Sequence, residues 1–340
     1  MQPRLVRAAR RKPVDRRPVW FMRQAGRSLP EYRAIRDSYD LFTICQRPEL
    51  CAEVTMQPVR RLGVDGAVLF ADIMLPVAFG LGVELRLVDG VGPVVDAPIR
   101  SQADIDRLQR RPAAEAVPFV LETIRLVRRE LDPSVALVGF AGAPFTLAGY
   151  LIEGKPSRDF LMTKSMMYNQ PALWDSLMSR LSSLVLDYLV AQIEAGAQVV
   201  QLFDSWVGAL SPDDYRRYVL PHTAAIFAGL AQSTTPTIHF ATGAAGILPL
   251  IREAGGDVIG VDWRVDLGDA WRTIGHDRGI QGNLDPALLL GPWHLIQAGA
   301  QHVVDAAGER PGHIFNLGHG VLPSTPVEHL QQLVEFVHAG

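Results

Sequence analysis

The segment Pro18–Arg27, with the sequence PVWFMRQAGR, joins an apolar run to two arginines four residues apart. We expect residues 18–22 to form a buried strand, so that the guanidinium groups of Arg23 and Arg27 emerge where the strand ends. A guanidinium holds a carboxylate through two parallel hydrogen bonds, which suits a ligand with several acidic groups. Taken alone, the same spacing also fits a basic surface turn. The rest of the chain favours the first interpretation, because polar residues follow other apolar runs in the same way.

Eight short apolar runs, bounded by Gly, Pro or Asp, predict buried strands. They cover residues 18–22, 66–71, 135–141, 198–203, 236–240, 257–261, 279–282 and 313–317. Continuous apolar runs are typical of parallel strands that are buried on both faces. Helical patterns separate the runs, and the longest covers Pro171–Ala195, where apolar residues recur every three or four positions. This alternation predicts an α/β fold, specifically a (β/α)8 TIM-type barrel in a single domain.

A doubly wound open sheet is the alternative fold, but no predicted strand is followed by the glycine fingerprint of a dinucleotide-binding turn. Between residues 83 and 95, the pair Asp89-Gly90 is typical of the turn of a small hairpin inserted into the barrel. The first seventeen residues carry seven cations and one acid. We therefore expect residues 1–17 to form a mobile basic arm and residues 18–340 to form the barrel catalytic domain.

Charge and cysteine content narrow the class of protein. The net charge is −3, whereas a general nucleic-acid binder is expected to be basic. No run approaches the length that crosses a membrane, and the basic segment lacks the apolar centre of a secretion signal. Two cysteines in 340 residues, Cys45 and Cys51, indicate no disulfide framework and fit a reducing cytosol. We expect a cytoplasmic protein that binds neither nucleic acid nor a membrane.

In a barrel of this kind, the active site lies at the carboxyl ends of the strands. Singly, each polar residue found there has an ordinary structural explanation, such as a helix cap or a turn. Together they predict a site with two arginines, a histidine, hydroxyl donors and a carboxylate, which fits an acidic ligand that also carries N–H groups. In chain order, these residues are Arg23, Arg27, Asp72, Tyr150, Ser205 and His319.

Six stretches of the chain carry a resemblance to a known family. They are PVWFMRQAGRSLPEYR (18–33), FADIMLP (70–76), GAPFTLAGYLIEG (142–154), FDSW (203–206), GNLDP (282–286) and NLGHG (316–320). By these motifs, which occur in the family's order and span nearly the whole chain, the sequence resembles the uroporphyrinogen decarboxylases. One small departure is Lys155, where the family often has glycine.

The resemblance implies a carboxy-lyase of haem and tetrapyrrole biosynthesis. Such an enzyme removes carbon dioxide from the four acetate arms of uroporphyrinogen III and gives coproporphyrinogen III. The resemblance also implies a homodimer and no metal or organic cofactor. The residues that match the family's substrate contacts are Arg23, Gln24, Ala25, Gly26, Arg27, Asp72, Tyr150, Ser205 and His319.

Decarboxylation of an acetate arm leaves an electron pair that needs an acceptor. A pyrrole accepts it once the ring is protonated at carbon and becomes a cationic iminium, so the substrate supplies the electron sink that a cofactor supplies elsewhere. We expect Asp72 to accept hydrogen bonds from pyrrole N–H groups and to stabilise that cation. We assign Arg23 as the proton donor, although an ordinary histidine pKa would suit His319 better for that role.

Two other functions stay open at this point. A zinc-dependent thiol methyltransferase of the related barrel group needs a His-X-Cys pair and a further cysteine downstream. None of the nine histidines has a cysteine two positions on, and Cys45 and Cys51 precede the second predicted strand, which we expect to place them far from the barrel mouth. The other function is a non-catalytic porphyrin carrier, which has no need of a buried central carboxylate.

Overall fold

The computed structural model describes residues 2–88 and 90–340. Its main sheet has seven strands that are hydrogen-bonded in chain order, and every pair is parallel. The strands are β1 (Gly66–Val68), β4 (Ala136–Gly142), β5 (Val199–Asp204), β6 (Thr237–Ala241), β7 (Val258–Gly260), β8 (Gly279–Leu284) and β9 (His313–Leu317). Each corresponds to one predicted apolar run. Because all seven run in the same direction, their carboxyl ends meet at one end of the curled sheet. The predicted single-domain α/β barrel is confirmed.

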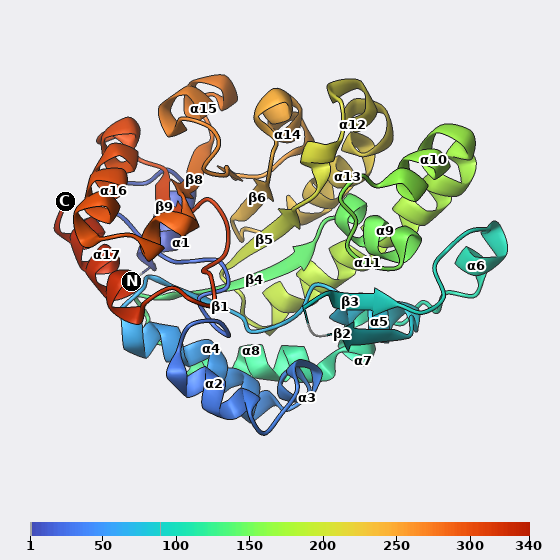
Figure 1. Cartoon of the computed structure of the whole chain (residues 1–340), viewed down its shortest axis with the longest axis horizontal. Coiled ribbons are helices and arrows are strands. Elements are labelled where there is room, and N and C mark those ends of the chain that lie inside the picture. The colour runs from blue at the N-terminus through green and yellow to red at the C-terminus, as the bar shows by residue number, and fades with distance from the viewer. Residues whose placement is uncertain (1, 89) are drawn as a thin grey trace.

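Helices surround the strands (Figure 1). They are α1 (Arg4–Ala9), α2 (Pro30–Arg36), α3 (Leu41–Cys45), α4 (Pro48–Leu62), α5 (Leu75–Leu81), α6 (Gln102–Asp106), α7 (Ala113–Ala116), α8 (Pro118–Glu130), α9 (Pro144–Glu153), α10 (Leu161–Asn169), α11 (Pro171–Ala195), α12 (Pro212–Tyr218), α13 (Leu220–Leu230), α14 (Leu248–Ala254), α15 (Leu267–Ile274), α16 (Trp293–Ala307) and α17 (Val327–Ala339). Short 3-10 helices cover Val207–Ala209, Ala245–Ile247 and Pro286–Leu290. The longest helix, α11, has the bounds that the apolar periodicity predicts.

The first predicted strand, residues 18–22, is reduced to an isolated parallel bridge between Val19 and Phe315. The N–H of Phe315 donates to Pro18 at 3.0 Å, and the N–H of Asp65 donates to Val19 at 2.7 Å. The segment therefore lies between β9 and β1 and closes the barrel without forming a full strand. Proline lacks an N–H group, and Arg23 has a positive φ of 58°, so regular ladder pairing cannot continue on either side.

The basic N-terminal segment is folded against the barrel. Helix α1 buries Leu5, Val6, Ala8 and Ala9. Leu5 packs against Gly66, the first residue of β1, so the helix covers the amino end of the barrel. This differs from the mobile arm that the charge of residues 1–17 predicts. The segment has a short apolar face as well as many cations. Burial of this face lowers the free energy of the folded protein, because apolar surface is removed from water.

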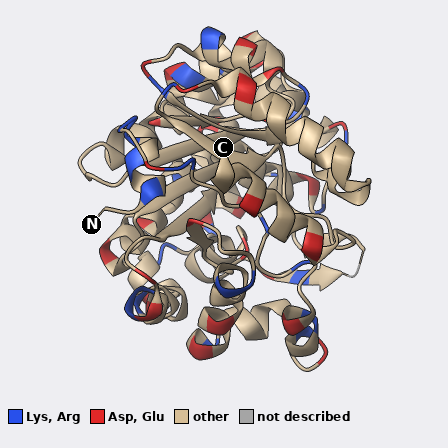
Figure 2. Ribbon diagram, turned by 90° about the vertical axis from the view of Figure 1, so that its left-hand side faces the viewer, with Lys and Arg blue, Asp and Glu red and all other residues tan. Residues whose placement is uncertain are grey.

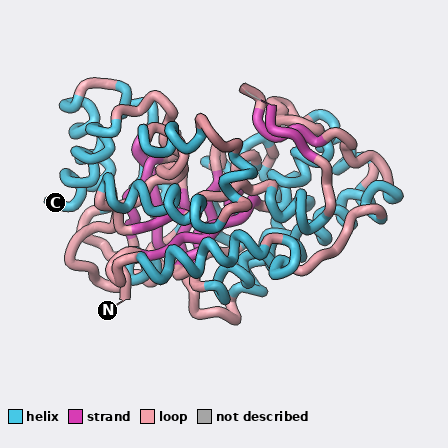
Figure 3. Tube along the Cα trace, turned by 90° about the horizontal axis from the view of Figure 1, so that it is seen from below, coloured by secondary structure: helices cyan, strands magenta, loops and turns pink. Residues whose placement is uncertain are grey.

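A separate two-stranded hairpin follows α5, as the sequence predicts. Strand β2 (Leu85–Val88) pairs antiparallel with β3 (Gly92–Val95). Asp89, in the predicted turn, lies outside the described residues. The hairpin stands apart from the main sheet (Figure 3), and the N–H of Val95 ties it to the carbonyl of Gly154 at the end of α9.

The remaining surface is mixed in charge. Lys and Arg are interspersed with Asp and Glu over the helices of the face shown in Figure 2. The N-terminal helix α1 and the C-terminal helix α17 lie on the same side of the barrel (Figure 1). In the part of the chain that the structure describes, no helix combines the length and the apolar character needed to span a bilayer.

Candidate active site

Gln24 anchors the loop that carries the two arginines. Its side chain accepts a hydrogen bond from the N–H of Phe21 at 2.9 Å and donates one to the carbonyl of Gly66 at 2.8 Å. The residue is 1% exposed. Gln24 was expected to contact the substrate, but both ends of its amide are engaged within the protein. Its side chain therefore fixes the loop to β1.

Gly26 is the residue that allows this loop to approach the barrel. Its φ is 86°, and a Cβ atom at this position would lie 2.4 Å from the ring of Phe70. Any other residue would therefore meet both backbone strain and a steric clash. The preceding residue, Ala25, is buried. Ala25 and Gly26 thus shape the loop, and the charges beside them come from Arg23 and Arg27.

Arg23 is exposed, whereas Arg27 is half-buried. Burial lowers the pKa of Arg27, and the nearby charge of Arg23 lowers it further. Arg23 also lies on Gly320, since a Cβ atom on that glycine would come within 2.6 Å of the Cδ of Arg23. The two predicted arginines are therefore neighbours, and the loop after β9 supports one of them.

Asp72 follows β1 and lies deep in the protein, although part of its surface stays accessible. Its Oδ1 accepts a hydrogen bond from the N–H of Met74 at 2.8 Å. Burial raises the pKa of Asp72, while the Met74 N–H and the charge of Arg23 act in the opposite direction. Among the described residues, Oδ2 has no hydrogen-bond partner. This leaves one carboxylate oxygen to interact with a ligand.

Tyr150, on α9, is a neighbour of Asp72. Burial and the charge of Asp72 raise the pKa of Tyr150 to about 12, so its hydroxyl stays protonated and can donate a hydrogen bond. Its ring lies 4.4 Å from that of Trp206. Ser205 precedes this tryptophan, and its carbonyl accepts a hydrogen bond from the hydroxyl of Thr242. The loop after β5 is thereby fixed beside Tyr150.

His319 lies in the loop after β9. Burial, together with the charges of Arg23 and Arg27, lowers its pKa to about 4. The imidazole is therefore neutral at neutral pH, with one nitrogen that donates and one that accepts. An ordinary histidine pKa would have made His319 a suitable proton donor. Burial and the surrounding cations lower this pKa too far for that role.

Electrostatic coupling links most of the predicted site residues. The charge of Arg23 opposes the burial that raises the pKa of Asp72, and the charge of Asp72 adds to the burial that raises the pKa of Tyr150. Both arginines lower the pKa of His319. Ser205 joins this group through Trp206, which packs on Tyr150. The structure thus brings together residues from the segment before β1 and from the regions that follow β1, β4, β5 and β9, whereas the side chain of Gln24 points elsewhere.

Two features of this region differ from what the sequence indicates. Cys45 and Cys51 were expected far from the barrel mouth, but the thiol of Cys51 donates to the carbonyl of Phe70 at 2.9 Å, two residues before Asp72. The Cys51 thiol and burial raise the pKa of Cys45, and the charge of Asp72 adds to the shift. The second feature is Arg264, which follows β7 and contributes to the lowered pKa of His319. No sequence motif pointed to it.

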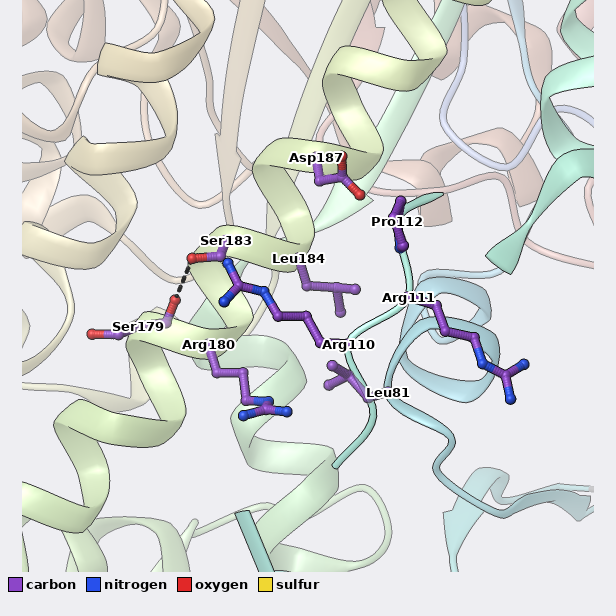
Figure 4. Close-up of a pocket in the computed structure, with 9 residues that line it drawn as sticks. All are labelled: Leu81, Arg110, Arg111, Pro112, Ser179, Arg180, Ser183, Leu184 and Asp187. Atoms are coloured by element: carbon purple, nitrogen blue, oxygen red, sulfur yellow. Dashed lines mark hydrogen bonds between the residues drawn. The ribbon is translucent and has the colours of Figure 1, made fainter. Parts of the chain in front are cut away.

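The described residues contain no group of three or more His, Cys, Asp or Glu side chains arranged to hold a metal ion. A cavity of about 560 Å³ lies on the outer wall of the barrel, between α11 and the segment before α7 (Figure 4). It is lined by Leu81, Arg110, Arg111, Pro112, Ser179, Arg180, Ser183, Leu184 and Asp187. The cavity shares no residue with the group around Asp72, so it is separate from the candidate site at the carboxyl end of the barrel.

Solved structures share this fold. A methyltransferase from Methanosarcina mazei has a TM-score of 0.77 at 23% sequence identity, and the match covers 98% of this chain and 97% of that one. At this level of identity, the likeness is evidence for the fold alone.

Sequence relatives are much closer. A uroporphyrinogen decarboxylase of Chloroflexus aurantiacus is 54% identical over 343 residues, which cover 100% of this chain and 96% of the relative. One from Thermus thermophilus is 52% identical, with 98% of this chain and 96% of the relative covered. The family model described as uroporphyrinogen decarboxylase (URO-D) matches residues 1–340. On this full-length match and these identities, the chain belongs to the uroporphyrinogen decarboxylase family.

Proposed function

We propose that this enzyme removes the carboxyl groups of all four acetate arms of uroporphyrinogen III at the carboxyl end of its barrel and releases coproporphyrinogen III. Family membership gives the reaction class, a decarboxylation in tetrapyrrole biosynthesis. The observation that best supports this site is the position of Asp72. A deeply placed carboxylate, one oxygen of which has no partner among the described residues, lies within electrostatic reach of Arg23 and Tyr150, and Arg23 in turn lies near the neutral His319.

The cations and hydroxyl groups serve to hold the substrate. Arg23 and Arg27 bind carboxylate arms through charge-assisted hydrogen bonds, which are stronger than neutral ones. Tyr150 and Ser205 donate hydroxyl hydrogen bonds to further carboxylates. His319 donates one N–H in its neutral form, so it holds an arm without adding a charge to the site.

Asp72 stabilises the reacting ring. Its free oxygen accepts hydrogen bonds from pyrrole N–H groups, and its negative charge faces the iminium that forms when the ring is protonated at carbon. A fixed anion accelerates the reaction because it interacts more strongly with the developing cation than with the neutral ring. The same ring accepts the electron pair when carbon dioxide leaves, so we propose that the reaction requires no metal or organic cofactor.

We assign the proton donation to Arg23, either directly or through a water molecule that its guanidinium holds. His319, with a pKa of about 4, carries no acidic proton to spare at neutral pH. Arg23 is the cation that acts on Asp72, which is expected of a group beside the reacting ring.

The test is incubation of the purified protein with freshly reduced uroporphyrinogen III, without added metal or cofactor. We expect the substrate to disappear and the hepta- to tetracarboxylate products to appear in turn by chromatography of the oxidised porphyrins. A porphyrin carrier would bind the substrate and release no carbon dioxide. Thiol methylation that depends on added zinc would instead support the methyltransferase alternative.

We further propose that the enzyme is a homodimer and acts in the cytoplasm. Support for a dimer comes from large apolar side chains on α10, where Leu161 is 70% exposed. Exposed apolar residues that cluster on one element are typical of association surfaces. Two reduced cysteines are consistent with a reducing compartment. Light scattering of the purified protein tests the dimer, and a monomeric mass at micromolar concentration would contradict it.

A further inference from the structure

Arg264 is a third arginine at the carboxyl end of the barrel. Its Nη1 donates to the Oδ2 of Asp262, and its backbone N–H donates to Oδ1 of the same carboxylate at 3.1 Å. Asp262 is itself 3% exposed and also accepts the N–H of Gly243. The guanidinium carbon lies 4.1 Å from the ring centre of Trp263. Ion pair and ring together restrict the guanidinium to one orientation.

The loop of Arg264 is in direct contact with the loop that carries His319. A Cβ atom on Gly318 would come within 2.3 Å of the backbone nitrogen of Trp263, so the two loops pack without any space between them. The stem of Arg23 lies on Gly320 at the other end of the same short loop. The charge of Arg264 also contributes to the lowered pKa of His319. Arg23, His319 and Arg264 thus form one continuous row.

Most of the hydrogen-bonding capacity of Arg264 is unused. A guanidinium has five N–H groups, and only Nη1 has a partner among the described residues. The side chain is 53% exposed although two neighbours hold it in place. An arginine that is fixed and still has free donors is well suited to bind a carboxylate, because little side-chain entropy is lost on binding.

We propose that Arg264 binds one carboxylate arm of the porphyrinogen, and that this arm is not the one undergoing decarboxylation. This inference rests on the proposed function, since it requires the substrate to lie over Asp72. Arg23 acts on the pKa of Asp72 and its stem lies on Gly320, whereas the loop of Arg264 packs at the Gly318 end of the His319 loop. The reacting ring therefore lies nearer to Arg23, and Arg264 reaches a peripheral arm on the far side of His319.

A group that binds a peripheral arm equally in the ground state and in the transition state affects KM and leaves kcat unchanged. We expect Arg264→Gln to raise KM for uroporphyrinogen III by roughly three- to tenfold, the range expected for one partly exposed charge-assisted bond. We expect kcat to stay within about twofold of the wild type. KM should also rise less steeply with salt concentration in the variant, because one ionic contact with the substrate is gone.

Arg310→Gln is the matched control. Arg310 also stacks on a tryptophan, with its guanidinium carbon 5.3 Å from the ring centre of Trp271, but it precedes β9 and lies at the amino end of the barrel. We expect KM, kcat and the salt dependence to match the wild type in this variant. If the Arg264→Gln substitution lowers Tm markedly, the Arg264→Lys variant is assayed in its place. Lysine keeps a positive charge opposite Asp262 but lacks the planar set of N–H donors that binds a carboxylate through two hydrogen bonds. We therefore expect this variant to raise KM about twofold or more.

The inference is overturned if a folded Arg264→Gln variant has the wild-type KM, or if kcat falls while KM stays constant. Either result would leave the proposed function intact, because the wild-type protein is assayed for decarboxylation in the same series. A wild-type protein that binds porphyrinogen without releasing carbon dioxide would contradict the proposed function itself. In that case, the dissociation constant for porphyrinogen is measured directly in place of KM. An unchanged dissociation constant in Arg264→Gln would still reject the inference.

Discussion

Asp72 combines two opposing influences at the scale of single residues. Burial favours its neutral form, whereas the N–H of Met74 and the charge of Arg23 favour the carboxylate. An anion with few competing partners interacts strongly with a cation that forms beside it. Its contribution to catalysis therefore depends on the charge and only weakly on the shape of the side chain.

The first prediction follows from this charge. Asp72→Asn keeps the shape and one hydrogen-bonding oxygen but removes the negative charge. We expect kcat to fall by roughly two to three orders of magnitude, with a smaller change in KM. Steady-state kinetics with uroporphyrinogen III measures both values. Full turnover in a folded Asp72→Asn variant would contradict the mechanism, whatever the effect on KM.

The second prediction concerns pH. Removing the charge of Arg23 in Arg23→Gln removes one influence that lowers the pKa of Asp72, so this pKa rises. Loss of the assigned proton donor lowers kcat/KM at every pH. Because the ionised carboxylate is the active form in the proposed mechanism, the acid limb of the remaining kcat/KM profile moves to higher pH. The profile of the variant, compared with those of the wild type and of Arg310→Gln, measures the shift. An unmoved or downward-shifted limb would show that Asp72 and Arg23 are not coupled in this way.

At the scale of elements, the arginine loop depends on a glycine that the sequence motif contains without explaining. Gly26 combines a positive φ with close contact to Phe70. Gly63, the residue that ends α4, has a similar φ of 69°, but a Cβ atom added there would have no other atom within 4 Å. Alanine substitutions at Gly26 and Gly63 therefore separate the free-energy cost of backbone strain from that of a steric clash.

We expect Gly63→Ala to lower the free energy of unfolding by about 1 kcal/mol, since an alanine in the left-handed region costs about that much. Gly26→Ala adds the displacement of Phe70, typically a further 1–3 kcal/mol for overpacking. Chemical denaturation of both variants measures the difference. Equal losses would mean that the Phe70 ring moves aside at no cost.

A hydroxyl residue followed by proline precedes two of the helices, and only one of these hydroxyl groups caps its helix. Ser211 caps α12, as expected for a serine before a proline, and its hydroxyl accepts the N–H of Asp214. Thr325 precedes a proline in the same way, yet its buried hydroxyl has no hydrogen-bond partner among the described residues, and α17 has no side-chain cap there. The same dipeptide pattern therefore gave different caps, because the surrounding packing decides where a short hydroxyl side chain points.

At the scale of the whole molecule, Asp65 joins segments from both ends of the chain. This residue is 1% exposed, and it accepts hydrogen bonds from the N–H of Val19, from Arg16 and from His338. Its neighbours come from the N-terminal segment, from the run that closes the barrel and from α17. Burial acts to raise the pKa of Asp65, but the bonds from His338 and Val19 outweigh it, so this pKa is lowered.

Asp65→Asn should therefore lower the free energy of unfolding by about 2 kcal/mol at neutral pH, because the half-buried Arg4 and Arg16 and the buried N–H of Val19 lose their charged acceptor. In the wild type, the stability from this carboxylate is fully present above the unfolded pKa of about 4 and is lost as the pH falls through the lower, folded value. The Asp65→Asn variant does not lose this contribution at acidic pH, because it has no carboxylate at position 65. Thermal unfolding between pH 7 and pH 3 tests both points. A constant difference in Tm over this range would contradict the assignment.

Much of the fold could be read from the chain, because apolar runs and apolar periodicity are local properties. Seven of the eight predicted strands and helix α11 follow from them. The motifs also identified the residues around Asp72. Two expectations failed for the same reason: the segment 18–22 and the basic segment 1–17 are defined by what they pack against. Val19 is bonded to distant residues on either side of it, and Leu5 is buried by Gly66.

The amino-acid order thus determined the class of fold, the family and the identities of the chemical groups, since each is encoded in residue type and spacing. It could not establish that His319 is neutral, that Gln24 turns inward, that the two thiols lie near Asp72 or that the loop of Arg264 packs against the loop of His319. Those properties arise from electric fields and contacts between segments that are distant in the sequence. Coulomb interactions and steric exclusion depend on distances in space, which exist only once the barrel has closed.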